Sequence, residues 1–158
     1  MIVLVMGVAG VGKTTIGEAL AQALGARFID ADDYHPPENV AKMKAGIPLQ
    51  DADRWPWLSR LNAELKTHRN AVLACSALKD VYRRRLAEGV EGFRVVYLHC
   101  AAELIRERMK TRQHRYMPAA LLDSQLATLE PPTDAIAIDV AAPLEESVAA
   151  IVKRLQPA

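Results

Sequence analysis

The segment GVAGVGKT, residues 7–14, has the residue types and spacing of a phosphate-binding loop, GxxxxGK(S/T). It lies between an apolar run and a stretch with helical periodicity. Gly7, Gly10 and Gly12 let the backbone wrap so that its N–H groups point inward, and the helix start adds the positive end of its dipole. The alternative is a glycine-rich turn with a surface lysine, but the position between strand and helix favours nucleotide binding.

Side chains of this loop are expected to complement its backbone. Lys13 would reach the β- and γ-phosphates of ATP, and Thr14 would offer its hydroxyl to Mg²⁺. The motif therefore predicts a set of nucleotide-binding residues that comprises Gly7, Val8, Ala9, Gly10, Val11, Gly12, Lys13, Thr14 and Thr15.

A second segment, FIDADDYHP (28–36), places three carboxylates in four positions after a short apolar run. Repulsion disfavours such a cluster unless a cation or a hydrogen-bonding ligand lies among the acids. If extended geometry continues past the strand, Asp30 and Asp32 point the same way and Asp33 faces away. We expect Asp30 to help organise hydrated Mg²⁺ and Asp32 to orient and deprotonate an acceptor hydroxyl. A plain turn is the alternative, because Asp is also a turn residue.

The third apolar run bears on what happens to the nucleotide. Switch and motor nucleoside triphosphatases usually carry a magnesium aspartate at the end of a further apolar strand. Here the run AVLAC ends at Cys75 and Ser76 without an acid, and the chain contains neither NKxD nor DxxG. These features favour a kinase that transfers phosphate to a separate acceptor.

Cationic side chains elsewhere could bind an acidic acceptor. In CSALKDVYRRR, residues 75–85, Lys79 and Arg83 are four apart, so they would share a helical face and could grip a carboxylate. A solvated basic face is the alternative. Arg54 opens a helix beside two tryptophans that are expected to pack. His35 lies in a turn restrained by the following proline and could hydrogen-bond hydroxyls.

A further arginine cluster lies in RERMKTRQHRYMP, residues 106–118. Arg108 and Arg112 would share a helical face, so the first could stack on adenine while the second reaches the phosphates. Kinases close over the transferring phosphate to exclude water, and closure typically brings in arginines. The alternative is an exposed basic helix end that complements its own dipole.

The elements that must position these residues follow from the hydrophobic pattern. Short apolar runs alternate with longer stretches at helical spacing, which indicates βα units around a parallel sheet. The runs predict strands at 2–6, 27–30, 71–75, 94–99 and 135–140. Helices are predicted along 16–24, after an N-cap at Asp53, and over 79–88, 102–112, 118–130 and 144–155. Pro56 would fall in the first turn of the second of these helices, where its missing N–H costs nothing.

In a doubly wound sheet, ligands bind at the carboxyl ends of the strands, so the acids of the second strand would lie beside the phosphate loop. A length of 158 residues indicates one domain, 1–158. The net charge of +1 argues against a nucleic-acid or anionic-membrane binder. No stretch reaches the roughly 18 apolar residues of a membrane span, and a cytoplasmic location is expected.

Together these motifs resemble those of the gluconokinase family, small P-loop sugar-acid kinases related in fold to shikimate and adenylate kinases. The resemblance covers nearly the whole chain and rests on GVAGVGKT, DADDYHP, NVAKMKAGIPLQDADRWPWL, CSALKDVYR and MPAALLDSQLATLEPP. Two departures stand out. Ala9 replaces a common Ser, and in QHRYMP His114 and Arg115 stand where a Gly and a His are more usual.

The resemblance implies ATP-dependent phosphorylation of D-gluconate to 6-phosphogluconate with Mg²⁺, by a homodimer. It implies an α/β P-loop NTPase fold, a three-layer sandwich with a five-stranded parallel sheet in the order 2-3-1-4-5 and a mobile lid at about 112–130. Lys13, Thr14 and Arg112 would handle phosphate, with Lys13, Asp32 and Arg112 catalytic. The residues implied for the sugar-acid pocket are Asp32, His35, Arg54, Lys79, Arg83 and, on the lid side, Gln125.

Two other functions stay open at this level. A kinase for shikimate or another small hydroxy acid would share the phosphate loop and the acid pair, but it would not need HP or DADRWPWL. An ATP-binding regulatory module would hydrolyse or sense ATP without responding to any sugar acid.

Overall fold

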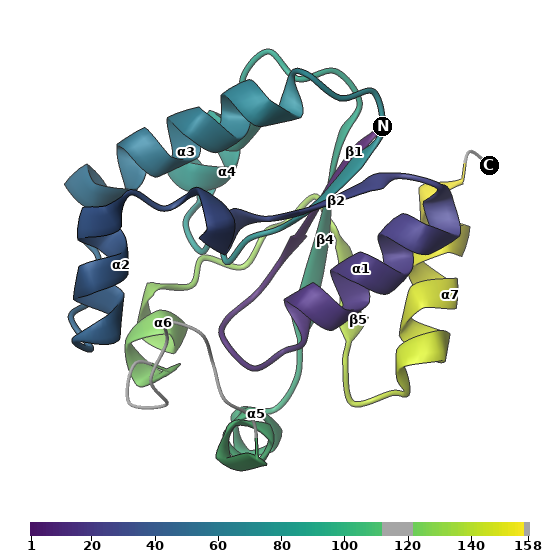
Figure 1. Cartoon of the computed structure of the whole chain (residues 1–158). Helices are drawn as coiled ribbons and strands as arrows, with labels where there is room; N and C mark the ends of the chain where they lie inside the picture. Colours follow the sequence, from purple (N-terminus) through teal and green to yellow (C-terminus); the bar gives the residue numbers. More distant parts are fainter. Residues whose placement is uncertain (112–121, 157–158) are drawn as a thin grey trace.

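The five predicted apolar runs form one parallel sheet in the order β2-β3-β1-β4-β5 (Figure 1). The computed structural model describes residues 1–111 and 122–156. Each strand begins and ends within one residue of its predicted bounds, and the predicted strand order is confirmed. The strands are β1 (Ile2–Met6), β2 (Arg27–Asp30), β3 (Ala71–Ala74), β4 (Phe93–His99) and β5 (Ile136–Asp139).

Helices cover both faces of the sheet, because successive side chains of the buried central strand point to opposite sides. Val3 and Val5 of β1 pack in the core cluster that includes residues of α1 (Lys13–Leu24) and α7 (Leu144–Leu155). The alternate residues of β1 pack with α3 (Asp51–Leu65) and α4 (Asp80–Ala87). Figure 1 shows these pairs of helices on opposite sides of the sheet, which confirms the three-layer sandwich.

Three further helices are α2 (Pro37–Lys44), α5 (Ala102–Thr111) and α6 (Leu122–Thr128). Helix α2 was not predicted from the sequence, although it begins with Pro37 and has Lys42 and Lys44 in its last turn. The helix predicted over 118–130 is described only from Leu122. In the described parts of the chain, no helix has the length and apolarity needed to cross a membrane.

The N-terminus of α3 differs from the prediction. The helix begins at Asp51 with Gln50 as its N-cap residue, and Asp53 is the third helical residue. The Asp53 Oδ2 atom accepts the Gln50 backbone N–H at 2.8 Å, as the acid of a capping box does. Asp53 as N-cap was therefore wrong. Pro56 lies beyond the first turn, because the helix starts earlier than its acid and proline suggested.

All five strands run parallel, so the loops that follow them meet at one edge of the sheet. The glycine-rich loop follows β1, and a short 3₁₀ helix, η1 (Ala31–Tyr34), follows β2. The loop after β3 carries Cys75 and Ser76. The fold thus brings the segments with candidate chemistry to the same end of the sheet.

Candidate active site

The phosphate loop packs too closely against its surroundings for side chains at two of its glycines. A Cβ on Gly7 would lie 2.7 Å from the carbonyl oxygen of Leu98, at the end of β4. A Cβ on Gly10 would lie 2.9 Å from the Ile105 side chain of α5. Both glycines also have positive φ, 154° and 87°. The loop conformation therefore requires glycine at both positions.

Lys13 lies at the start of α1, where its side chain folds back across the loop. Its Nζ donates to the Val8 carbonyl at 3.0 Å. Burial lowers the pKa of Lys13, whereas the neighbouring carboxylates of Asp32 and Asp30 act in the opposite direction. The structure thus places the phosphate-binding lysine predicted from the motif next to the predicted acid pair.

The acids after β2 are arranged differently from the expectation, because the extended geometry does not continue past Asp30. The chain turns into η1, and Asp30 caps it by accepting the Asp32 backbone N–H at 3.0 Å. Asp32 lines a pocket, while Asp33 is exposed. The expectation that an extended chain aligns Asp30 with Asp32 was wrong, since an aspartate before a turn readily accepts a backbone N–H two residues on.

The pocket beside the loop is bounded by η1, α2, α3, α4, α6 and the segment after β3. Asp32, His35, Arg54 and Gln125 line it, and all four were among the predicted substrate residues. The segment that contains α2 and the loop after it contributes several wall residues, and sequence reasoning missed that contribution. The other lining residues are Met43, Ile47, Pro48, Leu49, Trp57, Ser76, Ala77, Leu78, Tyr82, Ser124 and Thr128.

His35 is buried against Trp57, with ring centroids 4.0 Å apart and planes 15° from parallel. Its Nδ1 lies 3.2 Å from the Asn39 amide nitrogen, and its Nε2 lies 3.8 Å from Asp32 Oδ1. Burial, and then the charge of Arg54, lowers the pKa of His35 to about 4. The ring is therefore neutral at physiological pH.

This shift predicts a pH dependence of folding stability. Unfolded His35 takes up a proton near pH 6.5, but the folded ring does so only near pH 4. The free energy of unfolding should therefore fall as the pH drops through this window, by about 2 kcal/mol at about pH 5. Urea denaturation at several pH values measures this fall. In His35→Gln, the free energy of unfolding should change less with pH over the same window. An identical slope in the variant would contradict it.

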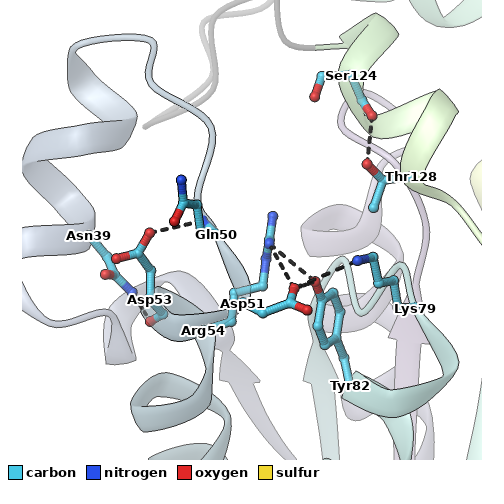
Figure 2. Close-up of polar contacts among 9 residues, drawn as sticks. All are labelled: Asn39, Gln50, Asp51, Asp53, Arg54, Lys79, Tyr82, Ser124 and Thr128. Carbon is cyan, nitrogen blue, oxygen red and sulfur yellow. Dashed lines mark hydrogen bonds and ion pairs between the residues drawn. The ribbon is translucent and has the colours of Figure 1, made fainter.

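Arg54 belongs to a polar cluster at the pocket rim that also contains Asp51, Lys79 and Tyr82 (Figure 2). The Tyr82 hydroxyl donates to Asp51 Oδ1 and accepts from Arg54 Nη1, the latter at 3.1 Å. Asp51 Oδ1 also lies 3.7 Å from Arg54 Nη1 and 3.7 Å from Lys79 Nζ. The hydrogen bond from Tyr82 and the two cations lower the pKa of Asp51. Asp51 was missed, although its position three residues before Arg54 on one helix could have indicated the contact.

Lys79 and Arg83 do not share a helical face, because α4 begins at Asp80 and Lys79 is its N-cap residue. The Arg83 guanidinium is buried and donates to three backbone carbonyls, those of Ala77 at 2.8 Å, Leu78 at 3.1 Å and Glu130 at 2.8 Å. It is not among the described residues that line the pocket. Its contacts instead hold the segment after β3 against the chain that follows α6.

We expect Arg83→Ala to destabilise the protein by about 3 kcal/mol, because it leaves three carbonyls without their charged donor. Urea denaturation measures this. Arg84→Ala is the matched control, since Arg84 is exposed and its ion pair with Asp80, at 2.7 Å, lies at the surface. A variant that unfolds like Arg84→Ala but binds gluconate more weakly would contradict the structural role and favour the substrate role expected from sequence.

Gln125 joins the pocket to the phosphate loop. It lies on α6, and its Oε1 accepts the backbone N–H of Ala9 at 2.7 Å. Arg108 of α5 donates to the Val140 carbonyl at 2.7 Å. The predicted phosphate contact of Arg112, the positions of His114 and Arg115, and the lid section 112–121 lie outside the described residues.

Thr14 and Asp30 are the residues predicted to hold Mg²⁺. Among the described residues, no group of three or more His, Cys, Asp or Glu side chains could hold a metal ion by itself. Mg²⁺ usually takes one or two protein oxygens together with phosphates and waters. The exposed Thr14 hydroxyl, at the start of α1, and the Asp30 carboxylate, at the end of β2, are oxygen donors of the required kind.

The chain is similar to known proteins over most of its length. Residues 2–132 match a protein family described as an AAA domain. A gluconokinase from Gluconobacter oxydans (strain 621H) is 46% identical, over 82% of this chain and 75% of its own. The thermosensitive gluconokinase of Escherichia coli (strain K12) is 43% identical, over 87% of this chain and 78% of its own.

A solved structure shows the same fold. The crystal structure of a gluconokinase from Sinorhizobium meliloti 1021 matches with a TM-score of 0.87 and 46% identity, over 97% of this chain and 90% of that one. The resemblance of the motifs, the arrangement of the strands and these relatives agree. The chain belongs to the gluconokinase family.

Proposed function

We propose that the protein phosphorylates D-gluconate to 6-phospho-D-gluconate with ATP. The observation that carries the proposal is a pocket lined by Asp32, a neutral His35 and Arg54, whose further lining residue Gln125 accepts the Ala9 backbone N–H of the glycine-rich loop. Binding of a polyol requires side chains that hydrogen-bond its hydroxyls, and binding of its carboxylate requires a cation. The site supplies both next to the loop that would hold the triphosphate.

The side chains divide the reaction between them. Asp32 accepts the proton of the attacking hydroxyl, whose oxygen forms a bond to the γ-phosphorus while the bond to the β–γ bridging oxygen breaks and ADP leaves. Lys13 and Arg112 stabilise the charge on the transferring group. Mg²⁺, held by Thr14 and Asp30, would neutralise phosphate charge. Thr15 and the backbone of residues 7–14 position the nucleotide, and Arg108 lies at its adenine.

The rim cluster is proposed to bind the carboxylate of the substrate. Arg54 lines the pocket, and Lys79 lies beside it through their shared contact with Asp51. A carboxylate that approaches these cations competes with Asp51 for them. Gln125, which bonds to Ala9, would close the opposite side of the pocket.

A coupled assay of ADP formation over a panel of acceptors tests the proposal. Gluconate should stimulate ADP formation strongly, and other aldonic acids, shikimate and nucleoside monophosphates should do so weakly. Stimulation by shikimate alone would favour the kinase for another hydroxy acid. ADP formation that no acceptor changes would favour the regulatory module and contradict an acceptor kinase.

Three further features belong to the proposal. Dependence on Mg²⁺ is supported by the Thr14 and Asp30 oxygens. A homodimer is supported by the resemblance of the motifs, and a cytoplasmic location by a sequence in which no stretch has the length of an apolar membrane span. Omission of Mg²⁺ from the assay and the mass of the protein in solution check the first two.

A further inference from the structure

Asn39, on α2, makes contacts that the sequence motifs did not predict. Its side chain is buried, and its amide nitrogen lies 3.2 Å from His35 Nδ1 and 2.8 Å from the backbone carbonyl oxygen of Asp53. Figure 2 shows Asn39 beside Asp53 at the start of α3. An amide nitrogen carries two hydrogens and only donates, so these two contacts use both of them.

The Asp53 carbonyl fixes which way the Asn39 amide points. With the amide turned over, its oxygen would face the Asp53 carbonyl oxygen, and two acceptors would meet without a hydrogen between them. The nitrogen therefore faces both partners. His35 Nδ1 must then accept, and the single proton of a neutral ring is left on Nε2.

The proton on His35 Nε2 faces the acid of the pocket. The distance of 3.8 Å from Nε2 to Asp32 Oδ1 is too long for a direct hydrogen bond. It is shorter than two hydrogen bonds of about 2.8 Å placed end to end, so one hydroxyl oxygen can lie within reach of both atoms. That hydroxyl would accept from His35 and donate to Asp32, and Trp57 would hold the ring plane by stacking.

We propose that Asn39 is a positioning residue that fixes His35 as the Nε2–H tautomer, so that His35 donates to the hydroxyl whose proton Asp32 accepts. The direction of the hydrogen bond from His35 to the hydroxyl matters, because an Nε2 without its proton would compete with Asp32 for the hydroxyl hydrogen. The hydroxyl would then turn its lone pair away from the phosphate. The second half of this proposal rests on the proposed function, and the first half is a property of the protein alone.

The first experiment reads the tautomer directly in ligand-free protein. Two-bond ¹H–¹⁵N correlation spectra of the four histidines, with His35 assigned through the spectrum of His35→Gln, distinguish a protonated Nε2 from a protonated Nδ1. We expect the Nε2–H pattern at about pH 7. An Nδ1–H pattern would overturn the proposal whatever the substrate proves to be.

The second experiment uses Asn39→Asp to reverse the direction of the hydrogen bond between residue 39 and His35. The new carboxylate accepts from Nδ1–H and so moves the proton away from Nε2. We expect kcat/KM for gluconate to fall by roughly 100-fold while KM for ATP stays within about twofold. Asn39→Ala removes the donor without putting an acceptor in its place, so its kcat/KM for gluconate should lie between those of the wild type and Asn39→Asp. If Asn39→Asp does not fold, a lower kcat/KM in Asn39→Ala tests the same proposal.

The matched control is Asn62→Asp. Asn62 is another buried asparagine, on α3, whose amide nitrogen donates to the Leu86 and Glu88 carbonyls at 2.9 and 2.8 Å. Asn62→Asp should have a lower free energy of unfolding than the wild type and the same kcat/KM for gluconate. Equal losses of kcat/KM in Asn39→Asp and Asn62→Asp would reduce Asn39 to a packing residue. If the wild type shows the Nε2–H tautomer but does not phosphorylate gluconate, the proposed function fails and the control of the ring by Asn39 stands.

Discussion

Lys13→Ala is expected to lower kcat for gluconate-dependent ADP formation by about a thousandfold or more. The Lys13 ammonium group is the cation at the start of α1, and it folds onto the loop that would hold the triphosphate. Without it, the charge that develops on the transferring phosphoryl group loses its nearest fixed cation. The coupled ADP assay with saturating ATP and gluconate measures the effect.

Lys66→Ala is the matched control, because Lys66 is an exposed lysine at the C-terminal end of α3. It should leave kcat unchanged. Circular dichroism should show both variants folded, since Lys13 is not part of either hydrophobic core cluster. Retention of a tenth or more of the wild-type kcat in Lys13→Ala would show that the loop does not hold the transferring phosphate as proposed.

Asp32→Asn is expected to lower kcat by about 10²- to 10⁴-fold, which is the usual contribution of a positioned general base. The amide keeps the shape of the side chain but cannot take the proton of the hydroxyl. Because Asp32 does not contact the nucleotide in this scheme, KM for ATP should stay nearly constant. Steady-state kinetics with each substrate varied in turn separate the two effects.

The neighbouring acid provides the control for this prediction. Asp33 is exposed on the same 3₁₀ helix, so Asp33→Asn makes the same chemical change one residue away. Its kcat should match that of the wild type. If Asp33→Asn were the impaired variant and Asp32→Asn the active one, the general base would have been assigned to the wrong carboxylate.

The sheet and the phosphate loop could be predicted because their signals are local. The strands are short apolar runs; β1 and β3 are buried along their whole length, so every residue of both had to be apolar. The loop has glycines at fixed spacing because backbone and side-chain atoms leave no room for a Cβ at Gly7 and Gly10. Both constraints leave a pattern that a single sequence shows.

The parts that could not be predicted depend on contacts between distant segments. The turn of the chain into η1, the capping of η1 by Asp30 and the wall that α2 adds to the pocket are tertiary features without a periodic signal. Arg83 shows the same limit, because its spacing from Lys79 indicated a shared face, whereas its partners lie in two separate loops. Similarly, the contact of Asn39 with His35 could not be predicted, because the orientation of the Asn39 amide depends on the Asp53 carbonyl beside it.

A structure of the protein with gluconate and a non-hydrolysable ATP analogue would show whether Asp32 faces the hydroxyl that attacks the γ-phosphorus. The sugar acid should fill the pocket beside the loop, with its terminal hydroxyl within hydrogen-bond distance of Asp32 and His35 and facing the γ-phosphorus. A sugar acid bound away from Asp32, or a nucleobase in that pocket, would contradict it.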